Sequence, residues 1–306
     1  MALYFGLLGG AWASPRVVVS IAPVHSLVTA VMEGIAEPQL IYRANQSPHS
    51  SALAPSQVKA ISNADVVVWL GAEFEFALGR LLGNFDPSAS INLLDMARQS
   101  GKSIESNPHS HDHDHSEENQ VESYGYASSD PHIWLSTDVA ADIVETVAET
   151  LSRVDPDNQA VYRTNADKVS TSIFELHNEL QESLSTVSDK PFIVYHDAYR
   201  YLEREFDLDA VAAVTISPEK TPGARHITEI AKLVDERQIQ CVFSEPQFQP
   251  KILDTLVSDL GLSVSTLDPL GDGLEPGKTL WFELMRNLEK SLVDCLEPNQ
   301  VVSANS

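Results

Sequence analysis

Residues 192–205 read FIVYHDAYRYLERE and contain the unit from which the predicted fold is built. The run 192–195 is β-branched or aromatic at every position, which predicts a strand buried on both faces. Residues 198–205 change to a helical pattern. His196 therefore follows directly on a buried strand, at the end where open α/β sheets bind their ligands.

The same alternation of strand and helix extends in both directions from this unit. The expected strands of the first half lack alternation of polar and apolar residues, so both faces should be buried, as in a parallel sheet under helices, and the crossovers set the same parallel sense in both lobes. We expect an α/β fold with two lobes of similar topology. The expected strands are 16–22, 39–42, 65–70, 90–94, 210–214, 240–243 and 263–267, and the expected helices are 24–34, 55–62, 75–82, 227–237, 250–260 and 279–296.

The alternation stops in the middle of the chain. Residues 99–130 are polar without an apolar period, as in functional or disordered loops, and 139–154 is an amphipathic helix. The helical pattern of 156–187 would extend about 45 Å at 1.5 Å per residue, enough to connect two lobes. We therefore expect a leader at 1–13, an N-terminal lobe at 14–155 that includes loop 99–130, a linking helix at 156–187 and a C-terminal lobe at 188–306.

Length and charge limit the classes of function. A chain of 306 residues has room for about two domains. Its 20 Lys and Arg against 44 Asp and Glu give a formal net charge of −24. This charge excludes a nucleic-acid binder and disfavours binding to anionic lipid. An acidic surface keeps a protein soluble and attracts cations.

The first thirteen residues, MALYFGLLGGAWA, are apolar and uncharged. They end in Ala-Trp-Ala, the small-x-small pattern of a signal-peptidase site, although a basic region in front is missing. The alternative is a buried first strand. No later run reaches the ~18 apolar residues of a membrane span, so we expect an exported protein without one.

The two cysteines, Cys241 and Cys295, leave two interpretations open. An even number in an exported chain indicates a disulfide, which would join the last helix to a core strand. The alternative is a pair of buried, unreactive thiols.

Histidines are the most informative residues of this chain. Four of them, with acidic neighbours, lie within seven positions of the polar loop, and such a segment binds divalent metals through weak, exchangeable contacts. The alternative is a solvated loop without a metal. These four are His109, His111, His113 and His115.

A second set of side chains stands at the ends of expected elements. His49 follows the second strand, His132 comes where the polar loop ends, His196 follows strand 192–195, and Asp268 follows strand 263–267. Three imidazoles and a carboxylate suit tetrahedral Zn²⁺, whereas Mg²⁺ and Ca²⁺ prefer oxygen ligands. Protonated imidazole cannot bind a metal, so affinity should fall as the pH drops toward about 6.

Four further residues are weaker candidates. His25 opens the first expected helix and could support a ligand, His177 is expected on the surface of the long helix, and His226 begins a helix. Glu245 ends a strand and would either orient a ligand or cap a helix.

Several short motifs, in this order, give a resemblance to a known family. They are SIAP at 20–23, SPH at 47–49, DPHIWL at 130–135, YHDAY at 195–199, SPE at 217–219, PG at 222–223, VFSEPQF at 242–248 and LDPLG at 267–271. With this set the chain resembles the ZnuA-like family, the periplasmic zinc-binding components of high-affinity zinc ABC transporters, across most of its length.

The resemblance implies two (β/α) lobes joined by a rigid helix, with the metal in the cleft between the lobes. It implies that His49, His132 and His196 are zinc ligands, and that Asp268 is the fourth or lies beside a water that completes the site. In manganese-binding relatives the position of His196 is usually a carboxylate, so His196 favours zinc. It further implies a His-rich insertion beside the cleft and a Cys241–Cys295 disulfide. The chain departs from the family in its short uncharged leader and its modest His-rich run.

The resulting prediction is a periplasmic, monomeric binding protein that delivers Zn²⁺ to a membrane permease and has no enzymatic activity. A zinc hydrolase is the first alternative, because three ligands and a water also make a catalytic zinc site, but no His-Glu-x-x-His run is present. A manganese or iron component of the same transporter class is the second. A zinc buffer or adhesin without a permease is the third.

Overall fold

The computed structural model describes residues 14–43, 46, 52–83, 85–104, 129–215, 222–248 and 251–297. The expected leader at 1–13 and the four histidines at 109–115 lie outside these ranges, as does His49.

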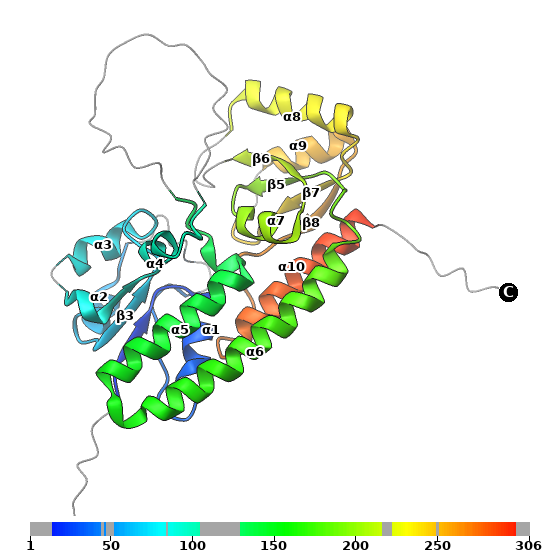
Figure 1. Ribbon diagram of the computed structural model, residues 1–306. Coiled ribbons are helices and arrows are strands. Elements are labelled where there is room, and N and C mark those ends of the chain that lie inside the picture. The colour runs from blue at the N-terminus through cyan, green and yellow to red at the C-terminus, as the bar shows by residue number, and fades with distance from the viewer. Residues whose placement is uncertain are drawn as a thin grey trace, which may run out of the picture.

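Two parallel sheets form the cores of two lobes (Figure 1). The N-terminal sheet has the order β2-β1-β3-β4 and the C-terminal sheet the order β6-β5-β7-β8, so the same arrangement occurs twice. This confirms the predicted fold class. The strands of the first sheet are β1 (Val17–Val19), β2 (Gln39–Leu40), β3 (Val66–Trp69) and β4 (Ser90–Asn92); those of the second are β5 (Phe192–His196), β6 (Ala210–Thr215), β7 (Cys241–Ser244) and β8 (Ser263–Thr266).

Helices connect and cover the strands. Those of the first half are α1 (Ala22–Val31), α2 (Pro55–Ser62), α3 (Phe76–Leu82), α4 (Leu93–Gln99), α5 (Thr137–Val154) and α6 (Gln159–Leu184). Those of the second half are α7 (Arg200–Phe206), α8 (Ala224–Arg237), α9 (Lys251–Leu260) and α10 (Leu280–Leu296).

Helix α4 was not anticipated. The strand expected at 90–94 ends at Asn92, whose side-chain oxygen accepts the N–H of Asp95 at 3.2 Å. A side-chain oxygen at this position satisfies one of the open N–H groups of a helix start. Asn92 therefore turns the chain from strand into helix inside an apolar run that sequence periodicity read as strand alone.

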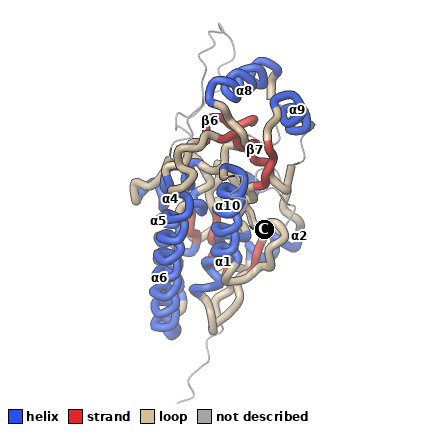
Figure 2. The backbone as a smooth tube through the Cα atoms, turned by 90° about the vertical axis from the view of Figure 1, so that its right-hand side faces the viewer, coloured by secondary structure: helices blue, strands red, loops and turns tan. Residues whose placement is uncertain are grey.

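The predicted linking helix is present as α6, and α10 adds a second connection between the lobes. The 26-residue α6 runs beside both lobes, and α10 lies along it and packs on α1 of the first lobe and β8 of the second (Figures 1 and 2). The main apolar core is accordingly continuous from Val17 in β1 to Phe243 in β7 and Leu296 in α10. Burial of this shared apolar surface holds the lobes together.

A disulfide fixes α10 to the second sheet. Cys241 of β7 is bonded to Cys295 of α10, with 6.2 Å between their Cα atoms. The prediction of a bridge between the last helix and a core strand is confirmed, and the alternative of two free thiols is excluded. Among the described residues, no helix has both the length and the apolar character needed to cross a membrane.

Candidate metal centre

The C-terminal lobe supplies His196 from the end of its central strand. His196 is the last residue of β5 and is 3% exposed. The neighbouring strand β7 is followed by Glu245, also buried, whose Oε1 lies 3.2 Å from His196 Nδ1. Parallel neighbours end at the same edge of a sheet, so this contact follows from the topology.

Tyr199 contacts the carboxylate of Glu245 through its hydroxyl. Its hydroxyl donates to the carbonyl of Leu267 at 2.9 Å and lies 3.3 Å from Glu245 Oε1. Burial, with the nearby carboxylates of Glu245 and Asp268 as the next causes, raises the pKa of Tyr199 far above its usual value. The phenol therefore stays protonated and can donate.

The N-terminal side supplies His132 from an irregular segment. His132 lies between Asp130 and the 3₁₀ turn Ile133–Leu135 that leads into α5. Oδ1 of Asp130 accepts the backbone N–H of His132 at 3.0 Å and lies 2.8 Å from His132 Nδ1. Both side chains are buried. The rings of Phe74 and Trp134 pack against the imidazole, at centroid distances of 5.9 and 5.3 Å.

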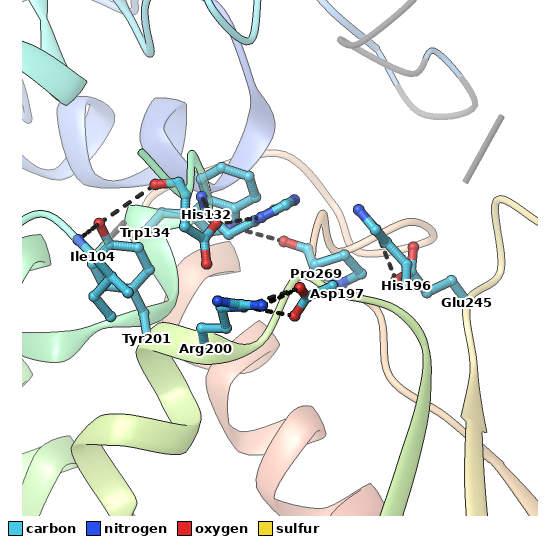
Figure 3. Close-up of polar contacts among 10 residues, drawn as sticks. Ile104, His132, Trp134, His196, Asp197, Arg200, Tyr201, Glu245 and Pro269 are labelled. Atoms are coloured by element: carbon cyan, nitrogen blue, oxygen red, sulfur yellow. Dashed lines mark hydrogen bonds and ion pairs between the residues drawn. The ribbon is translucent and has the colours of Figure 1, made fainter. Parts of the chain in front are cut away.

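The two imidazoles meet between the lobes. The ring centroids of His132 and His196 are 5.0 Å apart at an interplanar angle of 77°, and the rings point toward one another in Figure 3. In each ring a buried carboxylate faces Nδ1. Because Asp130 is hydrogen-bonded to Nδ1 of His132, it favours the tautomer in which Nε2 carries the lone pair that binds a metal, whereas Glu245 lies within ion-pair distance of Nδ1 of His196.

Asp268 lies in a loop of its own after β8. Its Oδ1 accepts from Gln247 Nε2 at 2.8 Å and from the backbone N–H groups of Leu270 and Gly271 at 3.0 and 3.1 Å. Burial raises the pKa of this carboxyl above its ordinary value. Within the described part of the chain, no three His, Cys, Asp or Glu side chains form a group able to hold a metal. The structure thus brings His132 and His196 together, whereas Asp268 is hydrogen-bonded to its own loop and to Gln247 after β7.

The other three histidines among the residues that the structure describes have separate partners. The buried His25 has Nε2 at 2.9 Å from the carbonyl of Pro38, and burial lowers its pKa. His226 has Nε2 at 2.9 Å from the carbonyl of Ala213. His177 was expected on the surface, but only 34% of its side chain is exposed, because it packs against Glu205 of α7.

Sequence reasoning missed the role of Asp130 and left that of Glu245 open. Each faces an imidazole, so Glu245 orients a ligand candidate and is not simply a helix cap. The Asp-x-His spacing of residues 130–132 was a usable signal, since a carboxylate two residues before a histidine can reach both its N–H and its Nδ1.

Comparisons with known proteins agree with this geometry. The family described as "Zinc-uptake complex component A periplasmic" matches residues 17–295. The chain is 37% identical to the high-affinity zinc uptake system protein ZnuA of Brucella abortus, over 95% of each chain. It is 33% identical to the ZnuA of Paracoccus denitrificans, over 92% of each.

Solved structures support the fold. A crystal structure of ZnuA superposes with a TM-score of 0.76 at 24% identity, covering 92% of this chain and 99% of the other. A Zn(II)-bound mutant variant of AdcAII from Streptococcus pneumoniae superposes with a TM-score of 0.73 at 25% identity, with the same coverage.

Proposed function

The chain belongs to the family of periplasmic zinc-uptake complex components, and on that premise we propose that His49, His132 and His196 bind the Zn²⁺ ion that it carries. As a member of this family it is a zinc-binding solute-binding protein of an ABC uptake system, and it is not an enzyme. Its partner is therefore the membrane permease of such a transporter.

One observation carries the ligand assignment. His132 and His196 come from different lobes, 64 positions apart (196 − 132) in the sequence, yet their rings meet at 5.0 Å, each with a buried carboxylate at Nδ1. A histidine that serves only to fill a core does not require this arrangement. A metal ligand does, because its second nitrogen is normally hydrogen-bonded to a carboxylate, carbonyl or water.

His49 and Asp268 complete the proposal. His49 belongs to the connection between β2 and α2, and a third imidazole would give the ligand set typical of zinc. The fourth position falls to Asp268 or to a water molecule beside it. The hydrogen bonds from Gln247, Leu270 and Gly271 all end on Oδ1 of Asp268, so we propose that Oδ2 would be the oxygen that binds the metal or the water.

The remaining parts of the proposal concern the polar loop and the state of the chain. We propose that His109, His111, His113 and His115 form an auxiliary, weaker binding segment, and that the protein works as a monomer. Zinc is thus captured in one tight site, with further ions held loosely nearby.

Competition against a chromophoric zinc chelator tests the ligand assignment. Replacing His49, His132 or His196 singly by Ala should lower the Zn²⁺ affinity by at least about a hundredfold, more than the loss of an outer-shell partner costs. His226→Ala is the control, because that ring contacts the carbonyl of Ala213. Deleting residues 105–128 should lower the stoichiometry and leave one tight site. Unchanged affinity in any of the three ligand variants contradicts the assignment of that residue, and loss of all tight binding on the deletion contradicts the assignment as a whole.

A further inference from the structure

We propose that α7 clamps the segment bearing His132 against the C-terminal lobe, with Tyr201 and Glu205 as positioning residues for the metal site. This inference rests on the proposed role of His132 and His196 as ligands. The His132 segment is defined here as residues 129–137, from the end of the polar loop to the first residue of α5.

Helix α7 is connected directly to the other ligand. It begins at Arg200, four positions after His196, so its place is fixed by strand β5. Tyr201 and Glu205 are four residues apart and lie on one face of the helix. Both project toward the His132 segment, and their contacts fall at its two ends.

Tyr201 holds the beginning of the segment. Its buried hydroxyl accepts the N–H of Ile104 at 3.0 Å and lies 3.4 Å from the carbonyl of Asp130, to which it can donate (Figure 3). The N–H of Asp130 in turn donates to the carbonyl of Ile104 at 2.8 Å. The phenol thus fixes the backbone of the same Asp130 whose carboxylate orients His132.

Glu205 holds the end of the segment. Its Oε2 accepts the N–H of Thr137 at 3.0 Å, and its Oε1 accepts the Thr137 hydroxyl. Thr137 opens α5, where backbone N–H groups lack partners and negative charge is favoured. His177 of α6 lies 3.0 Å from Glu205 Oε1 and ties this contact to the long helix.

A third contact secures the centre of the segment. The indole N–H of Trp134 donates to the carbonyl of Pro269 at 2.7 Å, and Pro269 is the neighbour of Asp268. The His132 segment is therefore attached to the C-terminal lobe at residues 130, 134 and 137, although it belongs to neither sheet.

The physical consequence concerns the metal more than the fold. A site binds tightly when its ligands are held within about 0.5 Å of the productive geometry before the metal arrives. Without the hydrogen bonds of Tyr201 and Glu205, His132 can move relative to His196. The two ligands then have to become ordered when the metal binds. Such changes act mainly on the dissociation rate.

The test uses the full-length protein and the substitutions Tyr201→Phe and Glu205→Gln, singly and together. Each removes hydrogen bonds and keeps the shape of the side chain. The matched controls are Tyr162→Phe, which removes an equally buried hydroxyl bonded to Asp155 Oδ2 at 2.9 Å, and Glu179→Gln, which removes a carboxylate paired with Arg286.

Three readouts are needed: Zn²⁺ affinity by chelator competition, the dissociation rate on mixing with excess EDTA, and the visible spectrum of the Co²⁺-loaded protein. The double variant should lose about tenfold in affinity, the lower end of what outer-shell partners cost. Most of this loss should appear as faster dissociation, with a weaker tetrahedral Co²⁺ band. The controls should lower the unfolding temperature without changing the metal readouts.

The failures of the two proposals are distinguishable. If His132→Ala abolishes tight binding but the clamp variants bind and release Zn²⁺ like the controls, the clamp is wrong and the ligand assignment stands. If His132→Ala leaves the Zn²⁺ affinity unchanged, the ligand assignment is wrong, and so is the inference about α7, because it rests on that assignment. A clamp effect of equal size in the His132→Ala background also overturns the inference, because it is then not transmitted through His132.

Discussion

The carboxyl ends of the two sheets differ although their strand orders are the same. In the C-terminal lobe, β5 ends in His196 and β7 is followed directly by Glu245. Asp268 comes two residues after Thr266, the last residue of β8. In the N-terminal lobe the corresponding edge carries a buried polar cluster, and His132 comes from a segment outside the sheet.

That polar cluster is built around Glu75. Its side chain is fully buried, Oε2 accepts the N–H of Leu70 at 2.7 Å, and the hydroxyl of Ser20 lies beside it. Burial raises the pKa of Glu75 to about 7, and the pKa of Tyr42 is raised by burial and by this carboxyl. The connection that follows β3 and β7 thus holds a buried carboxylate in both lobes, but Glu245 faces an imidazole whereas Glu75 accepts a backbone N–H within its own lobe.

The comparison of the two sheet edges indicates how a site between two lobes is assembled. The C-terminal half of the site is a consequence of sheet topology, because adjacent parallel strands end side by side. The N-terminal half depends on contacts between the segment that bears His132 and the C-terminal lobe, such as the hydrogen bond of Trp134 to the carbonyl of Pro269. The two halves should therefore respond differently to the perturbations below.

The largest effect is expected from the disulfide, which only the C-terminal sheet possesses. A Cys241→Ala/Cys295→Ala variant should lose about 4 kcal/mol of unfolding free energy, from the entropy of a loop with 54 residues of separation. Chemical denaturation measures the loss, and hydrogen exchange should place it in β5 to β8. Equal loss of protection in β1 to β4 would contradict the expectation that the effect is largest in the sheet that carries the bond.

A somewhat smaller effect is expected from Glu75 in the N-terminal lobe. Its folded-state pKa of about 7 lies above its ordinary 4.5, so between these pH values the folded chain retains a proton that the unfolded chain releases. The contribution of protonated Glu75 is fully present below about pH 4.5 and is lost as the pH rises through about 7. At pH 8 the ionised group costs up to about 3 kcal/mol.

Glu75→Gln should therefore stabilise the protein at pH 8 and not at pH 4.5, as urea denaturation across this range would show. Glu73→Gln is the control, since that carboxylate is on the surface, 41% exposed, and pairs with Arg98. If the free energy of unfolding of Glu75→Gln differs from that of the wild type by the same amount at every pH, the carboxyl does not titrate in this range.

The smallest effects are expected from the carboxylates that orient the two histidines. Asp130→Asn and Glu245→Gln should each lower the Zn²⁺ affinity by about ten- to a hundredfold. Asp130 should have the larger effect, because it also accepts the backbone N–H of His132 and its contact with Nδ1, at 2.8 Å, is shorter than the 3.2 Å of Glu245. Titration against a chelator measures both, and a larger effect of Glu245 would reverse the ranking.

Much of the framework could be read from local patterns. Runs such as 66–70 and 192–195 are apolar throughout, and this property marks buried parallel strands without knowledge of their neighbours. The positions of His196 and Asp268 after strands followed from the same runs. Helix α4 was missed because the capping contact of Asn92 interrupts a run with no change in hydrophobicity.

Other features depend on partners far away in the sequence. Helix α10 packs on α1 as well as on β8 and so adds a second connection between the lobes. Its amphipathic pattern predicts that one face is buried but not which elements bury it. The pattern gave two possibilities for Cys241 and Cys295, and only the 6.2 Å between their Cα atoms decides for a bond.

The sequence alone indicates the two α/β lobes, the motifs that resemble a zinc-uptake component, and the histidines proposed to bind the metal. The tertiary structure adds that the rings of His132 and His196 meet, that Asp130 and Glu245 face their Nδ1 atoms, and that α7 contacts the segment bearing His132. The reason is physical. Burial and periodicity are properties of neighbouring residues, whereas the meeting of two side chains is fixed by every contact that packs one lobe against the other.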